Sequence, residues 1–149
     1  MERIIYQKTA KHEEKHWWFV GRRLIVEHML STLPLQPQAN ICEIGCGTGG
    51  NLELLSRYGQ VFGFEMDDEA RQFALQRGIS PILPGSLPYD IPFADILFDL
   101  IMMMDVLEHV EEDEKSLIEV GKPQKSKKKY NYQLIANILS LKNQFSPKF

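Results

Sequence analysis

A cluster of glycines follows the first apolar run of the chain and is the feature best suited to contact a ligand. Gly45, Gly47, Gly49 and Gly50 stand within six residues, and Glu43 precedes the first of them by two positions. Because glycine has no Cβ, the backbone N–H groups of such a cluster can approach a bound molecule closely. The cluster therefore predicts a site in which the main chain touches the ligand.

Two ligands and one purely structural role fit these glycines. Gly45, Gly47 and Gly50 satisfy G-x-G-x-x-G, and Glu65 lies 20 residues after Gly45, as a nicotinamide dinucleotide site requires. An acid two residues ahead of the first glycine instead suits a ligand without phosphate. The glycines could also serve only to let a strand and a helix pack closely.

The carboxylate of Glu43 favours the ligand without phosphate. It would repel a neighbouring pyrophosphate by about 4 kcal/mol at an effective dielectric constant near 20. S-adenosylmethionine carries an α-ammonium and a sulfonium group, both cationic, and its two ribose hydroxyls could bond to Glu65 at the end of the next strand. We therefore predict S-adenosylmethionine as the cofactor.

These residues need a scaffold, and the apolar spacing predicts one of alternating strands and helices. Trp17, Leu24, Ile25, Met29 and Leu33 keep a helical spacing before Pro34 ends the pattern. The predicted helices span residues 17–33, 51–58, 67–77 and 112–120, and the predicted strands span residues 40–44, 61–65, 82–83 and 98–104.

Alternation of this kind predicts an α/β fold in which a parallel sheet is covered by helices on both faces. Ligands of such sheets bind beyond the carboxyl ends of the strands. The glycine cluster, Glu65, residues 85–87 and residues 104–109 all follow predicted strands. The fold should therefore bring the candidate ligand-binding residues to one edge of the sheet.

With these motifs the chain resembles the class I S-adenosylmethionine-dependent methyltransferases, of the small-molecule type that includes the ubiquinone-biosynthesis O-methyltransferases. The similar motifs are EIGCGTG at 43–49, GFEM at 63–66, GSLP at 85–88, FDLI at 98–101 and DVLEHV at 105–110. The family usually has Asp in place of Ser86, whose hydroxyl can still accept from the adenine amino group. The resemblance covers about residues 12–120 and implies a Rossmann-like fold.

The resemblance also implies which residues hold the cofactor. HWWFVGRR at 16–23 is similar to a helix that caps the site in many of these enzymes, where an aromatic ring shields the sulfonium and an arginine pairs with the methionine carboxylate. Alternatively, Trp17 and Trp18 are core anchors, and Arg22 and Arg23 are solvated. The implied cofactor residues are Glu43, Gly45, Cys46, Gly47, Gly49, Glu65, Met66, Ser86, Leu87, Met104, Trp18 and Arg22.

A further implication of the resemblance concerns Asp105, Glu108 and His109. Quinone O-methyltransferases of this kind place a metal ion on an acid-x-x-Glu-His cluster, so these residues could hold Mg²⁺ beside a small-molecule methyl acceptor. In relatives without a metal the same sequence shapes the acceptor side of the pocket, and we favour that interpretation. His109 is then the candidate catalytic base, although alignment contributes more to methyl transfer than proton transfer does. The other histidines, His12, His16 and His28, are expected on helix surfaces.

The composition indicates one globular domain. The chain has 149 residues, of which 44% are hydrophobic and 25% charged. No apolar run approaches the ~18 residues of a membrane span, and the N-terminus is too polar for a signal peptide. Cys42 and Cys46 suit neither a disulfide framework nor a zinc site, so we expect a cytoplasmic protein without a membrane partner.

Charge divides the chain near residue 121. Residues 1–120 hold all 20 acidic and 10 basic side chains, whereas residues 121–149 hold 7 basic and no acidic ones. The fifth strand of the family is not recognisable in the second part. We therefore predict that residues 1–120 are a methyltransferase domain interrupted by truncation or a frameshift. Residues 121–149 are expected to be a basic tail that is disordered or forms a short helix within residues 132–141.

Such an interruption predicts an incomplete sheet of four strands in the order 3-2-1-4. The apolar strand at 98–104 would then be an open edge through which chains could self-associate, and cofactor affinity and turnover would be reduced. Two alternatives remain at this point. The lysines of residues 122–129 could bind nucleic acid, which would make the chain a non-catalytic binding module. The chain could also be a fragment of a dinucleotide-binding oxidoreductase.

Overall fold

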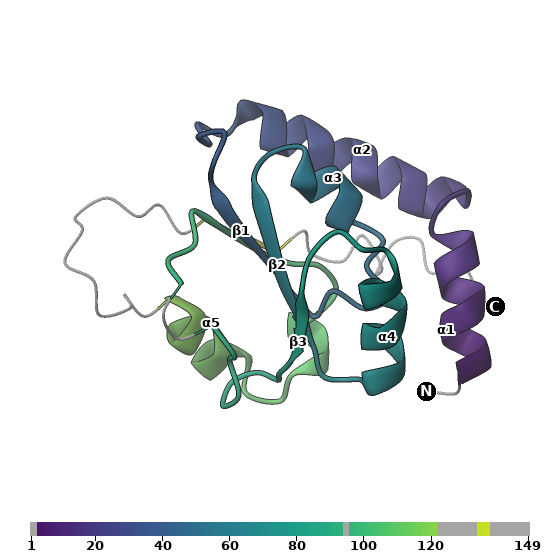
Figure 1. Cartoon of the computed structure of the whole chain (residues 1–149). Coiled ribbons are helices and arrows are strands. Elements are labelled where there is room, and N and C mark those ends of the chain that lie inside the picture. The colour runs from purple at the N-terminus through teal and green to yellow at the C-terminus, as the bar shows by residue number, and fades with distance from the viewer. Residues whose placement is uncertain (1–2, 94–95, 122–133, 138–149) are drawn as a thin grey trace.

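A computed structural model describes residues 3–93, 96–121 and 134–137 of the chain. Its centre is a parallel sheet of β1 (Asn40–Ile44), β2 (Gln60–Glu65), β3 (Ile82–Pro84), β4 (Leu100–Met103) and β5 (Leu134–Asn137). The strands lie in the order β3-β2-β1-β4-β5, so that β1 occupies the middle (Figure 1). The predicted α/β class and the order 3-2-1-4 of the first four strands are confirmed.

The structure corrects the prediction for the outer edge of the sheet. We expected residues 98–104 to form an open edge and residues 132–141 to be helical. Instead β5 pairs with β4 in parallel, with Leu100 opposite Leu134 and Met103 opposite Asn137. The helix prediction is therefore wrong for residues 134–137, and self-association through an open β4 edge loses its basis. The rest of the predicted basic tail and the interruption near residue 121 lie outside the described residues.

Two apolar layers cover the sheet because side chains alternate along each strand. Ile41 and Leu100 face the layer formed with α2 (Trp17–Thr32), α3 (Leu52–Ser56) and α4 (Asp68–Gln76). Cys42 and Ile101 face the opposite layer, where phenylalanines and α5 (Asp113–Gly121) pack (Figure 1). Both faces of β1 and β4 are thus buried, which explains their uninterrupted apolar sequences.

The helix α2 forms as predicted but buries a different face from the one that its spacing suggested. Trp17, Leu24, Ile25 and Met29 are exposed, whereas Val26 and Leu30 are buried against the sheet. Only a narrow stripe of this helix meets the sheet, so most of its apolar residues remain on the surface. No membrane-spanning helix is found within the described residues.

A first helix, α1 (Arg3–His12), was not predicted from the sequence. It packs beside α4 (Figure 1), and the hydroxyl of Tyr6 bonds to the carboxylate of Asp67. Asp67 is also the N-cap of α4, because its Oδ1 accepts from the N–H groups of Glu69 (2.9 Å) and Ala70 (3.0 Å). The start of α4 is therefore tied to α1 through one side chain.

Candidate cofactor site

Two cavities meet at the carboxyl ends of β1, β2 and β4. The strand-end cavity has a volume of about 490 Å³ and is lined by Ile44, Gly45, residues 64–66 and 85–89, Asp105, Val106 and residues 109–112. The glycine-loop cavity has a volume of about 120 Å³ and is lined by Glu13, Phe19, Arg22, Arg23, Glu43, Gly45, Cys46, Gly47, Gly50, Asn51 and Met104. Gly45 borders both, so one ligand lying across Gly45 could occupy the two cavities together.

The glycines of the loop have different roles. Gly45, Gly47 and Gly49 have φ values of 64°, 55° and 81°, in the left-handed region that favours glycine. The space beside Gly47 is open, whereas a Cβ on Gly45 would lie 2.7 Å from Cγ2 of Val106. Gly49 faces the backbone of Ala74 in α4 and lines neither cavity. Gly47 is therefore the glycine that leaves the main chain open toward a ligand.

Glu43 presents a buried carboxylate to the glycine-loop cavity. Its Oε1 accepts from Nδ2 of Asn51 at 2.7 Å, while Oε2 has no hydrogen-bond partner within the described part of the chain. Burial raises the pKa of Glu43 to about 7, although the Asn51 hydrogen bond and the charge of Arg22 oppose the change. A cation near Oε2 would satisfy this oxygen and favour its ionised form.

Glu65 lies at the end of β2 and holds the glycine loop against the next helix. Its Oε2 accepts from the N–H of Gly47 and its Oε1 accepts from the N–H of Asp67, both at 2.9 Å. Each carboxylate oxygen retains a further lone pair. Glu65 lines the strand-end cavity, where those lone pairs can accept from hydroxyl groups of a ligand.

Most of the other predicted cofactor residues are divided between the two cavities. Met66, Ser86 and Leu87 line the strand-end cavity, and Cys46 and Met104 line the glycine-loop cavity. Ser86 is held in a tight loop by two backbone hydrogen bonds with Asp90, at 2.8 and 2.9 Å.

Arg22 of α2 reaches the site and pairs with Asp105, which follows β4 and has a positive φ of 55°. Its Nε, also buried, has no hydrogen-bond partner among the described residues, and the guanidinium lies 5.5 Å from the centre of the Phe19 ring. Arg23 lines the same cavity but donates to the backbone oxygen of Glu14 (3.3 Å). The structure thus separates two arginines that the sequence could not distinguish.

The glycine-loop cavity is therefore suited to a zwitterion. It is lined both by the unpaired acceptor Oε2 of Glu43 and by Arg22, whose Nε is an unpaired donor. Unsatisfied buried polar atoms are costly, so two of opposite character around one cavity indicate a ligand that bonds to both. The methionine end of the predicted cofactor has an ammonium and a carboxylate group, which fit this pair.

The sequence matches the family described as methyltransferase domain over residues 42–125, more than half of the chain. The chain belongs to the methyltransferase domain family. It is also 28% identical over 116 residues to an uncharacterized protein of Methanocaldococcus jannaschii, a match that covers 77% of this chain and 53% of that protein. The chain thus spans about half the length of the curated relative that it matches.

Solved structures agree with the fold of this methyltransferase domain. One is a putative S-adenosyl-L-methionine-dependent methyltransferase from Methanococcus maripaludis, with a TM-score of 0.68, 15% identity and coverage of 80% of this chain and 57% of that one. Another is the magnesium protoporphyrin IX methyltransferase of Synechocystis with bound S-adenosylhomocysteine, with a TM-score of 0.53, 20% identity and coverage of 68% and 51%. At these identities the likeness concerns the fold, which is that of the class I S-adenosylmethionine-dependent methyltransferases.

The three residues considered for a metal ion do not gather into a site. Asp105 is paired with Arg22, and Glu108 is exposed on the 3-10 turn Leu107–His109 outside both cavities. No group of three His, Cys, Asp or Glu side chains that could hold a metal occurs in residues 3–93, 96–121 and 134–137. Asp105 and His109 line the strand-end cavity without Glu108, so the arrangement does not fit the Mg²⁺ site that the sequence left open as the less favoured interpretation.

The capping helix contributes the predicted Arg22 but a different aromatic residue from the one predicted. Trp18 lines neither cavity, and Trp17 is 66% exposed, so Trp17 is not the core anchor of the alternative interpretation. Phe19 supplies the aromatic ring beside the glycine-loop cavity instead. His16 is the N-cap of α2, accepting from the N–H of Trp18 at 3.3 Å, while His12 and His28 are exposed as expected.

In addition to Phe19, three residues of the site were not predicted from the sequence. Asn51 holds Glu43, Glu13 lines the glycine-loop cavity, and Tyr89 lines the strand-end cavity, where its hydroxyl donates to Glu112 at 2.7 Å. Asn51 directly follows the glycine cluster, a position that could have indicated its role. Glu13 lies 30 residues before Glu43, and no local pattern connects them.

Proposed function

We propose that this methyltransferase domain binds S-adenosylmethionine across Gly45 and directs its methyl group to a small-molecule acceptor in the strand-end cavity. The observation that carries the proposal is a pair of buried atoms at the glycine-loop cavity, Oε2 of Glu43 and Nε of Arg22, that find no hydrogen-bond partner in the described part of the chain. An amino-acid zwitterion satisfies both, since the ammonium donates to the first and the carboxylate accepts from the second.

The carboxylate of Glu43 also argues against a dinucleotide as the ligand. A pyrophosphate over the glycine loop would lie close to Glu43, and two like charges about 4 Å apart repel by about 4 kcal/mol at an effective dielectric constant near 20. Glu43 could avoid the repulsion by staying protonated, because burial holds its pKa near 7. A cationic ligand instead favours the ionised form of Glu43 and meets no such repulsion.

In this proposal the residues of the chain bind and orient the cofactor and the methyl acceptor. Glu43 and Arg22 fix the amino-acid end, and Glu65 accepts from the ribose hydroxyls while it holds the loop through Gly47. Ser86 and Leu87 border the adenine. S-adenosylmethionine supplies, when bound, an electrophilic methyl group on a sulfonium, so alignment of the acceptor is the main contribution required of the protein.

The acceptor would occupy the part of the strand-end cavity bordered by Tyr89 and His109. A volume of about 490 Å³ lies within the range of small-molecule sites. We propose that His109 faces the acceptor and can take a proton from it. NMR signals of the His109 ring should therefore move when a true acceptor is added, and unchanged signals would count against this role.

Isothermal titration calorimetry with S-adenosylhomocysteine and with NADH tests the proposal. We expect a single-site isotherm with the first ligand and no heat with the second. Gly47→Ala should weaken binding, because its Cβ would occupy the open space above the loop. Gly78→Ala is the matched control, since Gly78 also has a positive φ (67°) and open surroundings but lies outside both cavities. Binding of NADH in place of S-adenosylhomocysteine would refute the proposal.

We also propose that the protein is located in the cytoplasm. Cys42 and Cys46 are both buried and unpaired. Free thiols persist in reducing compartments, where disulfides rarely form. Fractionation of cells that express the tagged chain would test this location.

A further inference from the structure

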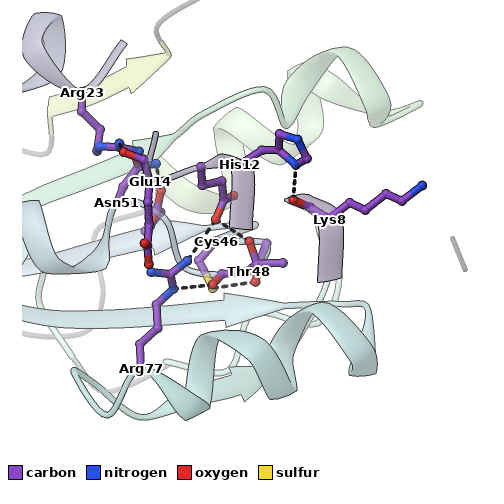
Figure 2. Close-up of polar contacts among 11 residues, drawn as sticks. Lys8, His12, Glu14, Arg23, Cys46, Thr48, Asn51 and Arg77 are labelled. Carbon is purple, nitrogen blue, oxygen red and sulfur yellow. Dashed lines mark hydrogen bonds and ion pairs between the residues drawn. The ribbon is translucent and has the colours of Figure 1, made fainter. Parts of the chain in front are cut away.

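Glu13, the residue that follows α1, reaches over the glycine loop. Its carboxylate bonds both to the loop and to the C-cap residue of α4. Its Oε2 accepts from Oγ1 of Thr48 at 2.6 Å and from Nη2 of Arg77 at 3.1 Å. Arg77 in turn donates from Nε to the backbone oxygen of Thr48 at 2.7 Å (Figure 2). The three residues form a closed triangle that joins the end of α1, the glycine loop and the end of α4.

The triangle is sheltered from solvent. The side chains of Glu13 and Arg77 are 12% and 23% exposed, and Thr48 is buried. The N–H of Glu13 donates to the backbone oxygen of Thr9 (2.8 Å), so Glu13 is continuous with the last turn of α1. Charge-assisted hydrogen bonds in such surroundings are stronger than on an open surface.

Glu13 also belongs to the wall of the glycine-loop cavity. A Cβ on Gly50 would lie 2.8 Å from the carboxyl carbon of Glu13, so the carboxylate rests directly against this glycine. Its negative charge contributes to the raised pKa of Glu43 across the cavity. Glu13 therefore touches the loop at Thr48 and Gly50, on either side of Gly49.

We propose that Glu13 is a positioning residue that couples the docking of α1 to the conformation of the glycine loop, and hence to cofactor affinity. The inference rests on the proposed function, because the loop is the part of the site that would contact S-adenosylmethionine. Coupling of this kind is reciprocal: a ligand held by the loop must also hold α1 more firmly in place.

Two measurements on the same proteins test the coupling. Calorimetry gives the Kd of S-adenosylhomocysteine, and amide hydrogen exchange of residues 3–12 and 48–50 reports the docking of α1 and the order of the loop, with and without the ligand. The variants are Glu13→Ala and Glu13→Gln, and Glu14→Ala is the matched control because the adjacent Glu14 side chain is exposed. Circular dichroism checks that each variant is folded.

In the wild-type chain we expect S-adenosylhomocysteine to slow exchange in α1, although the ligand would lie at the loop. Glu13→Ala should weaken binding about tenfold, because it removes the hydrogen bonds from Thr48 and Arg77 that hold the loop to the end of α1. It should also speed exchange of both segments without ligand and remove the effect of ligand on α1. Glu13→Gln should lie between the two, because its amide oxygen still accepts from Thr48 but its charge no longer pairs with Arg77.

Unchanged affinity of Glu13→Ala, together with ligand protection of α1 equal to that of the wild-type chain, would overturn the inference and leave the proposed function intact. Absence of S-adenosylhomocysteine binding by the wild-type chain would instead count against the proposed function. In that case ligand-free exchange still decides the coupling. Faster exchange of both segments in Glu13→Ala supports it, and equal exchange in both proteins refutes it.

Discussion

Replacing Glu43 with glutamine removes a buried charge while keeping the shape of the side chain and the acceptor for Asn51. Burial places the pKa of Glu43 at about 7, against an ordinary value of 4.5. Between these two pH values the folded chain keeps a proton on Glu43 that the unfolded chain has already lost. The free energy of unfolding of the wild-type chain should therefore fall as the pH rises through this window, by the linkage of proton binding to folding.

The size of the effect follows from the two pKa values. Each pKa unit is worth about 1.36 kcal/mol, so titration of Glu43 removes about 2–3 kcal/mol of stability between pH 5 and pH 8. The glutamine variant has no such titration. For a chain of this size the difference corresponds to about 5–10 °C in Tm. Other titrating groups are shared by both proteins and cancel when the two are compared at each pH.

Urea unfolding of wild type and Glu43→Gln at pH 5, 6, 7 and 8 measures the effect. We expect the stability of the variant relative to the wild type to rise by about 2–3 kcal/mol across this range. Glu53→Gln is the control for the Glu-to-Gln change itself, because Glu53 is an exposed carboxylate on α3. A difference between Glu43→Gln and the wild type that stays flat across the pH range would refute the reasoning that Glu43 is buried with an unsatisfied oxygen.

Three further substitutions, with Gly78→Ala as a control for the first, test the packing of the fold by urea unfolding. Gly45→Ala should lower the free energy of unfolding by about 2–3 kcal/mol, since it adds a clash with Val106 to the strain of a positive φ. Gly78→Ala has only the strain and should lower it by about 1 kcal/mol. Equal losses would mean that the Val106 side chain moves aside. Asp67→Ala removes the N-cap of α4 and should cost about 1 kcal/mol. The hydrogen bond from the N–H of Ala70 is the main cause that lowers the pKa of Asp67. The stability that Asp67 contributes is therefore present above its ordinary pKa of 3.8 and should fade as the pH drops below that value. A loss of stability in Asp67→Ala that stays constant into acid would contradict this reasoning. Phe98→Ala should cost about 3–5 kcal/mol, because the ring is buried among the phenylalanines beneath the sheet, and a loss under 1 kcal/mol would show that the layer can collapse around the gap.

The sequence predicted the first four strands and the helices between them because those elements are specified locally. The apolar runs of β1 and β4 are buried on both faces, and their bounds differ from the predicted ones by at most two residues. The glycine cluster, with Glu43 and Glu65 around it, was also the basis for predicting a ligand site at the ends of the strands. Positive φ at Gly45 and Gly47 favours glycine whatever the rest of the chain does.

Elements that depend on distant partners were predicted less well. The α1 helix has little apolar character of its own, and its position depends on contacts with α4 and on Glu13. The buried stripe of α2 was misjudged because most apolar residues of this helix are exposed. A helix was expected at β5 because the apolar residues at 134, 135, 138, 139 and 141 keep a helical spacing, whereas pairing with β4 makes residues 134–137 a strand.

The sequence by itself thus determined the family of folds and the glycine loop, and it led to the prediction that Glu43 favours a cation, all from residues close together in the chain. The tertiary structure decided which arginine reaches the site, left Oε2 of Glu43 and Nε of Arg22 without partners among the described residues, and brought Glu13 onto the loop. The physical reason is that the contacts of Arg22 and Glu13 join residues 35 to 83 positions apart, for which no local periodicity exists. Only the packing of α1 against α4 and of α2 on the sheet brings them together.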